Sequence, residues 1–302
     1  MISHDNRTID FPPRDKRLRV VMDTDIANEI DDHFAVCEML LSPERFDVQA
    51  VIAAPYLHER VKTHEEGMEN SYAELHKLFG IMGRNDFELI KRGSTHPMIS
   101  AGNPVISEGA QKIIELAHQA KQDGEKLYII GIAAVTDIVS ALLMAPEIRD
   151  AVIICWLGGH YPGPWQNDEY NLSQDYLASQ HLFASGVPLI QFPCRNVAQM
   201  LSLCKEELKA RYCGSATLDY LRERTLADMK LCGNASRSIW DVAPVAWLLD
   251  ETPFISETLP PPRLELDGSE HKQENAPLYR RIASLQRDPI MEQLLSVLKR
   301  AQ

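Results

Sequence analysis

Short β-branched runs alternate with segments of helical periodicity up to about residue 200 of the chain. The run at 151–157 (AVIICWL) is apolar at every position, which indicates a strand that is buried on both faces. Strands of this kind, separated by helices, pair in parallel and are covered by helices on both sides. The alternation therefore predicts an α/β fold with a doubly wound, mostly parallel sheet.

The same pattern predicts where the individual elements lie. Strands are expected at 19–22, 48–54, 127–132, 151–157 and 188–191. Helices are expected at 31–41, 65–79, 106–120, 136–144, 173–183, 206–211, 216–229, 242–249 and 290–300. No internal repeat or linker is visible, so we expect a single domain over 1–302 with its core at about 18–250. Residues 251–302 are expected to be an irregular, proline-rich segment followed by a C-terminal helix.

The charge balance argues against polyanionic partners. The chain has 31 Lys and Arg against 43 Asp and Glu, a formal net charge of −12. Nucleic acid and anionic membrane surfaces would be repelled without a strong basic patch, and the basic runs here are short. No stretch approaches the roughly 20 apolar residues that a membrane-spanning helix needs. We therefore expect no nucleic-acid partner and no membrane partner.

The cysteines and the N-terminal residues predict a compartment. Six cysteines are spread along the chain without a C-x-x-C pair, so neither a zinc site nor a disulfide framework is expected. Residues 1–17 are polar and contain proline, whereas a signal peptide has an apolar centre. These features predict a cytoplasmic protein with reduced thiols.

A cluster of carboxylates follows the first expected strand, within the segment VVMDTDIANEIDDHFA at 20–35. Its five acids are Asp23, Asp25, Glu29, Asp31 and Asp32. Open α/β sheets bind their ligands at this end of the strands. Carboxylates that converge there either hold a proton or bind a hard cation through oxygen, and we expect the cation. Helix capping would explain Asp31 and Asp32, but it leaves Asp23 and Asp25 at the strand end without a role.

The acidic turn resembles the opening motif of the nucleoside hydrolase family, D-x-D-x-G-x-D-D, in its inosine–uridine-preferring and related branches. Asp23-Thr24-Asp25 and Asp31-Asp32 match its two acidic pairs. The connector between them is two residues longer and lacks the glycine. The form D-T-D-x-x-N-E-x-D-D therefore looks like a divergent branch of the family.

Three further motifs resemble the family and follow in its order. Val135-Thr136-Asp137, with A-P-E-I at 145–148, is similar to L-T-N…P-E-I. Glu169-Tyr170-Asn171 is similar to E-F-N, and Trp240-Asp241-Val242-Ala243 stands where the family has H-D-P-x-A. Alone, Glu169 and Asn171 would be interpreted as a solvated loop with a helix cap, and Asp241 as another cap.

The resemblance implies a Rossmann-like fold and an enzyme that hydrolyses the N-glycosidic bond of a ribonucleoside, or a related N-riboside, to ribose and free base. It implies Ca²⁺ as cofactor, held by Asp25, Asp32, the Thr136 carbonyl and Asp241. A calcium-bound water would attack the sugar, with Asp25 as its general base. The family further implies purine or pyrimidine salvage and a homo-oligomer, either a dimer or a tetramer.

The remaining site residues are also implied by the resemblance. Asp31, Glu169 and Asn171 would bind the ribose, and Asp23 would support the metal ligands from behind. The sequence departs from the family at Pro55, which replaces an Asn on the ribose. Asn28, in the longer connector, is expected to supply that contact.

The histidine that precedes the last Asp in the family is Trp240 here. We expect Trp240, or Trp165 in the Pro162–Trp165 loop, to stack on the departing base, while a packing role for Trp240 is equally compatible with the sequence. His160 and His33 are the alternatives for a leaving-group acid.

Two other functions compete with the hydrolase. A haloacid-dehalogenase-type phosphatase also has D-x-D after an apolar strand, but its later G-D-x-x-x-D motif is missing here. A non-catalytic, calcium-dependent nucleoside- or sugar-binding protein would keep the ligands and tolerate Pro55 and Trp240.

Overall fold

The computed structural model of the protein describes residues 9–274 and 276–301. Residues 1–8, 275 and 302 belong to the expected domain but lie outside the described residues. Residues 1–8 are also part of the segment 1–17, for which no signal peptide is expected. No helix in the described part of the chain is long and apolar enough to cross a membrane. The six cysteines are free thiols.

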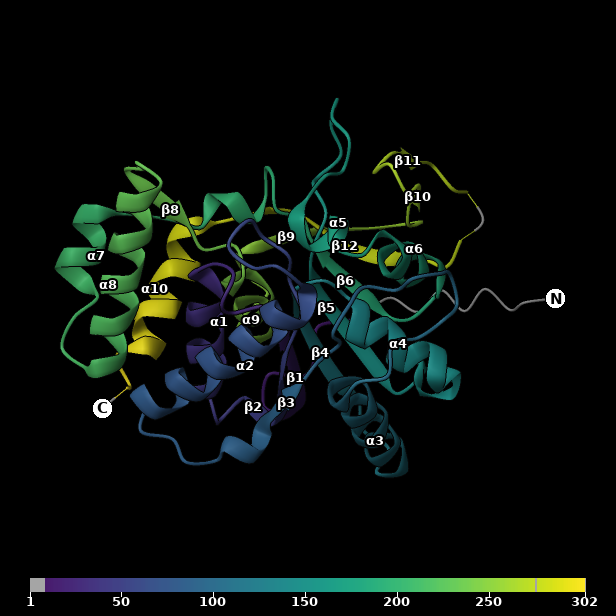
Figure 1. Cartoon of the computed structure of the whole chain (residues 1–302), viewed down its shortest axis with the longest axis horizontal. Helices are drawn as coiled ribbons and strands as arrows, with labels where there is room; N and C mark the ends of the chain where they lie inside the picture. Colours follow the sequence, from purple (N-terminus) through teal and green to yellow (C-terminus); the bar gives the residue numbers. More distant parts are fainter. Residues whose placement is uncertain (1–8, 275, 302) are drawn as a thin grey trace.

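Within the described residues, eight strands form one sheet in the order β3-β2-β1-β4-β5-β6-β12-β9 (Figure 1). Their bounds are β1 Leu18–Thr24, β2 Phe46–Ala53, β3 Ile90–Arg92, β4 Leu127–Ile132, β5 Val152–Leu157, β6 Leu189–Phe192, β9 Phe254–Leu259 and β12 Tyr279–Leu285. Only the pair β12 and β9 is antiparallel; the other neighbours in this sheet are parallel. The order reverses at β1, so the predicted doubly wound sheet is confirmed.

Helices cover both faces of the sheet, because its strands are apolar on both sides. Val20 and Met22 of β1 face one core, and Val21 faces the other. On the first face lie α1 (Asp31–Leu40), α2 (His64–Ile81), α8 (Ala216–Leu231), α9 (Val242–Leu249) and α10 (Arg287–Leu298). The second face carries α3 (Glu108–Gln122), α4 (Thr136–Met144) and α6 (Tyr176–Ala184) (Figure 1).

The helix expected at 173–183 is two helices, α5 (Tyr170–Ser173) and α6. The side chain of Asp175 accepts a hydrogen bond from the Ala178 amide and caps α6, so the chain restarts its helix there. The short helix α7 (Lys205–Arg211) lies close to its predicted position.

The prediction that 251–290 is irregular is wrong. This segment supplies β9 and β12, and the hairpin of β10 (Arg263–Leu264) and β11 (Glu270–His271) lies between them. β12 was not predicted, because Arg280 and Arg281 give its sequence the polarity of an exposed segment. These side chains pair with Glu251 at 3.1 Å and Glu257 at 2.6 Å, so their charges are tolerated in a strand that belongs to the sheet.

Candidate active site

The acidic turn lies where the strand order of the sheet reverses. β1 ends at Thr24, which aligns with Ala53 of β2 on one side and with Ile132 of β4 on the other. Asp25 follows directly, and α1 begins at Asp31. Parallel strands leave a crevice at their carboxyl ends at such a reversal, and doubly wound proteins bind ligands there.

Hydrogen bonds within the turn fix its shape. The Asn28 amide donates to the Asp25 carbonyl at 2.7 Å, which closes a tight turn directly after the strand. The Thr24 hydroxyl donates to Asp32 Oδ1 at 2.5 Å and joins the strand end to the first turn of α1. Asn28 is buried, whereas Glu29 is exposed. The longer connector therefore adds one buried polar residue and one exposed acid to the turn.

Three of the predicted site carboxylates converge. Oxygen atoms of Asp31, Asp32 and Asp241 all lie within 4.8 Å of one another, and all three residues are buried. Asp241 reaches the cluster from the start of α9. Asp25 lines the same cavity, here called the acid cavity, which has a volume of about 230 Å³. Its other lining residues are Asn28, Glu29, Ile132, Leu157, His160, Glu169, Tyr170, Asn171, Cys194 and Trp240.

Burial and mutual repulsion shift the titration of these acids. Burial, followed by repulsion from neighbouring acids, raises the pKa of Asp25, Asp32 and Asp241 well above the usual range. Burial also raises the pKa of Asp31, and the Arg237 guanidinium opposes that shift. Two like charges about 4 Å apart repel by about 4 kcal/mol at an effective dielectric near 20. A set of oxygen donors under this repulsion fits a hard divalent cation.

One cation, Arg237, lies close to the acids of the turn. Arg237 belongs to β8 (Ser236–Ser238), and its Nη2 lies 2.7 Å from Glu29 Oε2 and 4.0 Å from Asp31 Oδ1. Its Nε lies 3.4 Å from Asp228 Oδ2, and its guanidinium stands 5.0 Å from the ring of Trp240. Arg237 was not predicted from the sequence. The one local signal was Glu29, an extra acid in the connector.

Glu169 and Asn171 line the acid cavity at the start of α5, where Glu169 is the residue just before the helix. The Glu169 carboxylate accepts hydrogen bonds from the amides of Gly159, Asn171 and Leu172 at 2.7 to 3.0 Å, so it caps the helix. The Asn171 side chain donates to the Leu157 carbonyl at 3.1 Å. The capping interpretation of Glu169 is therefore confirmed, and the cap at the same time lines the cavity.

Thr136, Asp23 and Trp165 are expected site residues that are not among those lining the acid cavity. Thr136 is buried at the start of α4, where its hydroxyl donates to Asp175 at 2.8 Å. Asp23 is fully buried in β1, and its carboxylate oxygens have no hydrogen-bond partner in the described part of the chain. Trp165 does not line the acid cavity but a larger one beside it, with Arg195 5.0 Å from its ring.

Tyr170, Cys194 and His160 line the acid cavity without a firm role assigned to them from the sequence. Tyr170 stands between the motif residues Glu169 and Asn171, and its hydroxyl donates to the Leu57 carbonyl. Cys194 and His160 come from loops, where no local pattern points to a site.

His33, the other candidate acid, faces away from the acid cavity. It is buried, and its Nε2 lies 3.0 Å from Glu74 of α2. His33 does not appear among the residues that line the acid cavity, whereas His160 does. Between the two histidines, the geometry therefore favours His160.

Solved structures with the same fold are known for several proteins. The "Plant nucleoside hydrolase - PpNRh1 enzyme" superimposes with a TM-score of 0.72 at 16% identity, covering 94% of this chain and 99% of that one. A purine-preferring ribonucleoside hydrolase from Gardnerella vaginalis gives 0.70 at 17% identity, with coverages of 94% and 99%. The type III effector protein XopQ, solved with adenosine diphosphate ribose, gives 0.66 at 17% identity, covering 94% of each chain.

Family membership follows from the sequence rather than from these low identities. No curated protein matches the chain. The family model described as "Inosine-uridine preferring nucleoside hydrolase" matches residues 20–278, which contain all four motifs and the acid cavity, and it favours the hydrolase over the phosphatase. The chain therefore belongs to the inosine-uridine preferring nucleoside hydrolase family and is an N-glycosyl hydrolase.

Proposed function

We propose that the protein hydrolyses the N-glycosidic bond of a ribonucleoside, or of a related N-riboside, with Ca²⁺ bound at the acid cavity. The convergence of Asp31, Asp32 and Asp241 at the reversal point of the sheet is the observation that carries this proposal. A sugar with neutral hydroxyls suits such a site, whereas a polyanion would be repelled by it.

Ca²⁺ would be held by Asp25, Asp32, Asp241 and the backbone carbonyl of Thr136. Carboxylate and carbonyl oxygens are the ligands that this ion prefers, and it accepts irregular geometry. Asp31 stands close enough to the other acids to share the ion or to bind a ribose hydroxyl beside it. When bound, Ca²⁺ supplies positive charge that orients the ribose hydroxyls and makes a nearby water more acidic.

Asp25 is the proposed general base. It lies on the acid cavity at the end of β1, and the Asn28 amide holds the backbone of its turn. In the reaction its carboxylate takes a proton from water while the water oxygen bonds to the anomeric carbon. The C–N bond breaks, and the base leaves with the bonding electrons and receives a proton. The buried carboxylates stabilise the positive charge that develops on the sugar.

The sugar and the base would lie between the remaining residues of the acid cavity. Asp31, Asn28 and Asn171 offer oxygen and amide groups to the ribose, and Glu169 stabilises the helix end that carries Asn171. Trp240 offers an aromatic face to the leaving base. His160 is the histidine of the acid cavity that could protonate that base.

The biological setting is part of the same proposal. We place the enzyme in purine or pyrimidine salvage in the cytoplasm, as a homodimer or homotetramer. The family membership supports the small-molecule substrate most directly.

Release of ribose from inosine, uridine, adenosine and cytidine tests the function, measured by reducing sugar with Ca²⁺ and with chelator. We expect Ca²⁺-dependent release, and we expect Asp25→Asn to lower kcat by about 100-fold or more. Asp288→Asn, at an exposed carboxylate in α10, is the matched control. Substantial activity in the Asp25 variant would refute its role as base. Nucleoside binding in calorimetry without ribose release would identify the non-catalytic binder instead.

A further inference from the structure

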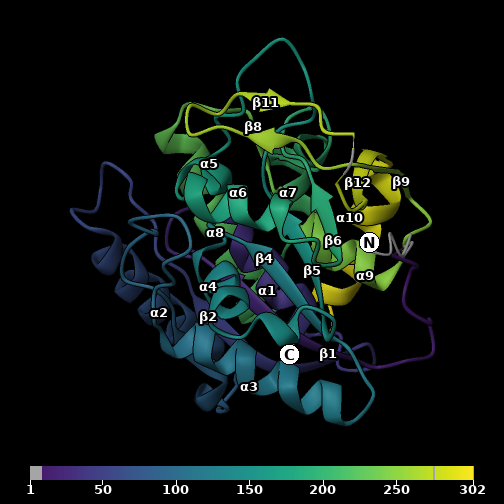
Figure 2. The same cartoon turned by 90° about the vertical axis from the view of Figure 1, so that its right-hand side faces the viewer.

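A second cavity adjoins the acid cavity. It has a volume of about 560 Å³, and His160 lines both cavities. Its walls come from the loop after β5, from the β10–β11 hairpin and from β12. Figure 2 shows β11 at the upper end of the molecule and β12 below it, beside β9. A ligand that filled both spaces would be longer than a nucleoside.

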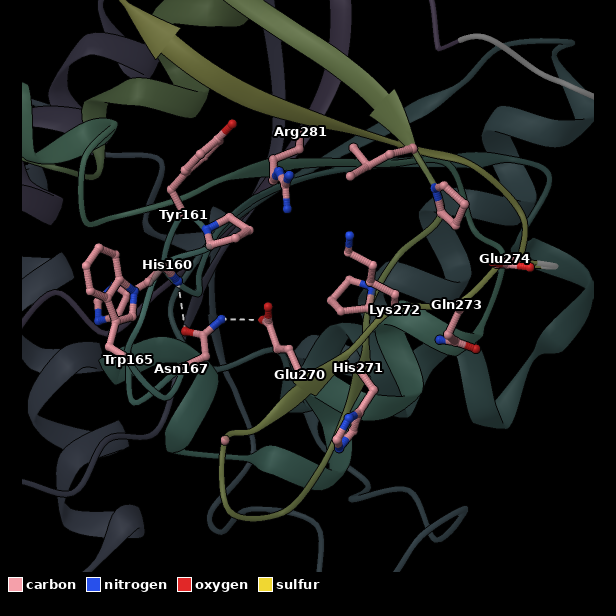
Figure 3. A pocket seen from close by; sticks show the side chains of 16 residues that line it. His160, Tyr161, Trp165, Asn167, Glu270, His271, Lys272, Gln273, Glu274 and Arg281 are labelled. Atoms are coloured by element: carbon pink, nitrogen blue, oxygen red, sulfur yellow. Dashed lines mark hydrogen bonds between the residues drawn. The ribbon is translucent and has the colours of Figure 1, made fainter.

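The wall of this second cavity is tied together by Asn167. Its Oδ1 accepts a hydrogen bond from the His160 amide at 2.8 Å, and its Nδ2 donates to Glu270 at 2.5 Å (Figure 3). The Asn167 amide also donates to the Gly268 carbonyl at 2.9 Å. Gly268 has φ +80°, and a Cβ there would lie 2.7 Å from the Asn167 carbonyl oxygen, so this close contact requires glycine. The loop and the hairpin therefore form one built wall.

Two cations point into the second cavity (Figure 3). Arg281 is held in place by Glu257 at 2.6 Å and by the ring of Tyr161 at 4.9 Å. Lys272 is exposed and has no ion-pair partner within residues 9–274 and 276–301. An arginine in a fixed orientation together with an exposed lysine is a common arrangement for binding a phosphate group.

Two carboxylates, Glu270 and Glu274, also line this cavity, and within the described residues neither forms an ion pair with Lys272 or Arg281. The Glu270 carboxylate is bonded to Asn167, and Glu274 lies at the edge of the cavity, away from Arg281 (Figure 3). His271 lies 3.9 Å from Glu265, outside the group formed by the two cations. Tyr161 and Trp165 add aromatic surface to the same wall, as is typical of nucleotide-binding sites.

We propose that the second cavity binds a phosphate group carried on the 5′ side of the riboside, so that the preferred substrate is a phosphorylated N-riboside rather than a free nucleoside. This inference rests on the proposed function, because the ribose must occupy the acid cavity. Lys272 and Arg281 bind the phosphate, and the aromatic wall packs against whatever the phosphate carries.

Calorimetry with ribose and ribose 5-phosphate tests this directly, because neither compound has an N-glycosidic bond to hydrolyse. With saturating Ca²⁺, we expect ribose 5-phosphate to bind about tenfold or more tightly than ribose, as hydrogen bonds to a charged group would give. The advantage should shrink about tenfold in Lys272→Ala and disappear in Lys272→Glu, while Lys299→Ala, at an exposed lysine after α10, should keep it.

Equal binding of the two sugars, or an advantage that survives in Lys272→Glu, would overturn the inference. Release of ribose from inosine and of ribose 5-phosphate from inosine 5′-monophosphate, both measured as reducing sugar, separates the inference from the proposed function. Release of sugar without a phosphate preference refutes the second cavity as a phosphate site and leaves the hydrolase standing. A phosphate preference without release of sugar from either compound refutes the hydrolase alone.

Discussion

Replacing Arg237 by methionine removes the cation that faces Glu29, Asp31 and Asp228. The side chain of Arg237 is only 10% exposed, and methionine keeps much of its apolar volume against Trp240. Breaking a buried ion pair from one side costs about 3–5 kcal/mol, because a charge is left without its partner. The Glu29 side chain is 44% exposed, so solvent screens part of that loss. We expect the free energy of unfolding to fall by about 2–3 kcal/mol.

Urea denaturation with saturating Ca²⁺ measures this loss. Arg211→Met is the matched control, since Arg211 pairs with Glu292 at 2.6 Å on the surface, and an exposed pair is worth about 1 kcal/mol or less. The double variant Glu29→Gln with Arg237→Met should recover part of the loss, because one of the unpartnered acids is removed. If Arg237→Met costs no more than the control, or if the two substitutions are additive, the idea that Arg237 balances the acid cavity fails.

Two further outcomes follow from the acid cavity. Ca²⁺ at about 100 times its dissociation constant should stabilise the protein by about 2.7 kcal/mol. Calorimetry should show this as a rise in Tm of several degrees, and the rise should be absent in Asp241→Asn. An unchanged Tm would contradict a cation site. Trp240→Ala should lower kcat/KM for nucleosides by about 3- to 10-fold, in line with a lost aromatic contact of about 0.5–1.5 kcal/mol, whereas Trp240→Phe should keep most of it. Equal activity of all three proteins would favour the packing role.

Much of the sheet and its helices could be predicted from local pattern. The bounds of α4 and α9 agree with the expected 136–144 and 242–249. Both helices are strongly apolar; α9 lies between Asp241 and Asp250, and α4 ends just before Pro146. The position of the acids after β1 was predictable because a strand end and a helix start are both local signals. That Asp241 joins Asp31 and Asp32 followed only from the family resemblance, and the structure confirms the convergence.

Features that depend on distant pairing were not predictable. β12 carries two arginines, so its place in the sheet depends on Glu251 and Glu257 of a different segment. Arg237 meets Glu29 only after α8 has folded back along α2, and no spacing in the sequence encodes that approach. Trp165 was expected near the departing base, but the loop that carries it packs with the β10–β11 hairpin instead.

The antiparallel pairing of β9 with β12 has a consequence for how this enzyme can diversify. β9 ends at Leu259 and pairs with β12, which begins at Tyr279, so residues 260–278 connect two neighbouring strands of the sheet. Their length and composition can change without shifting the register of the other strands or moving the carboxylates after β1. Selection, or an engineer, could therefore exchange this one segment to alter which molecules enter while the hydrolytic chemistry stays the same.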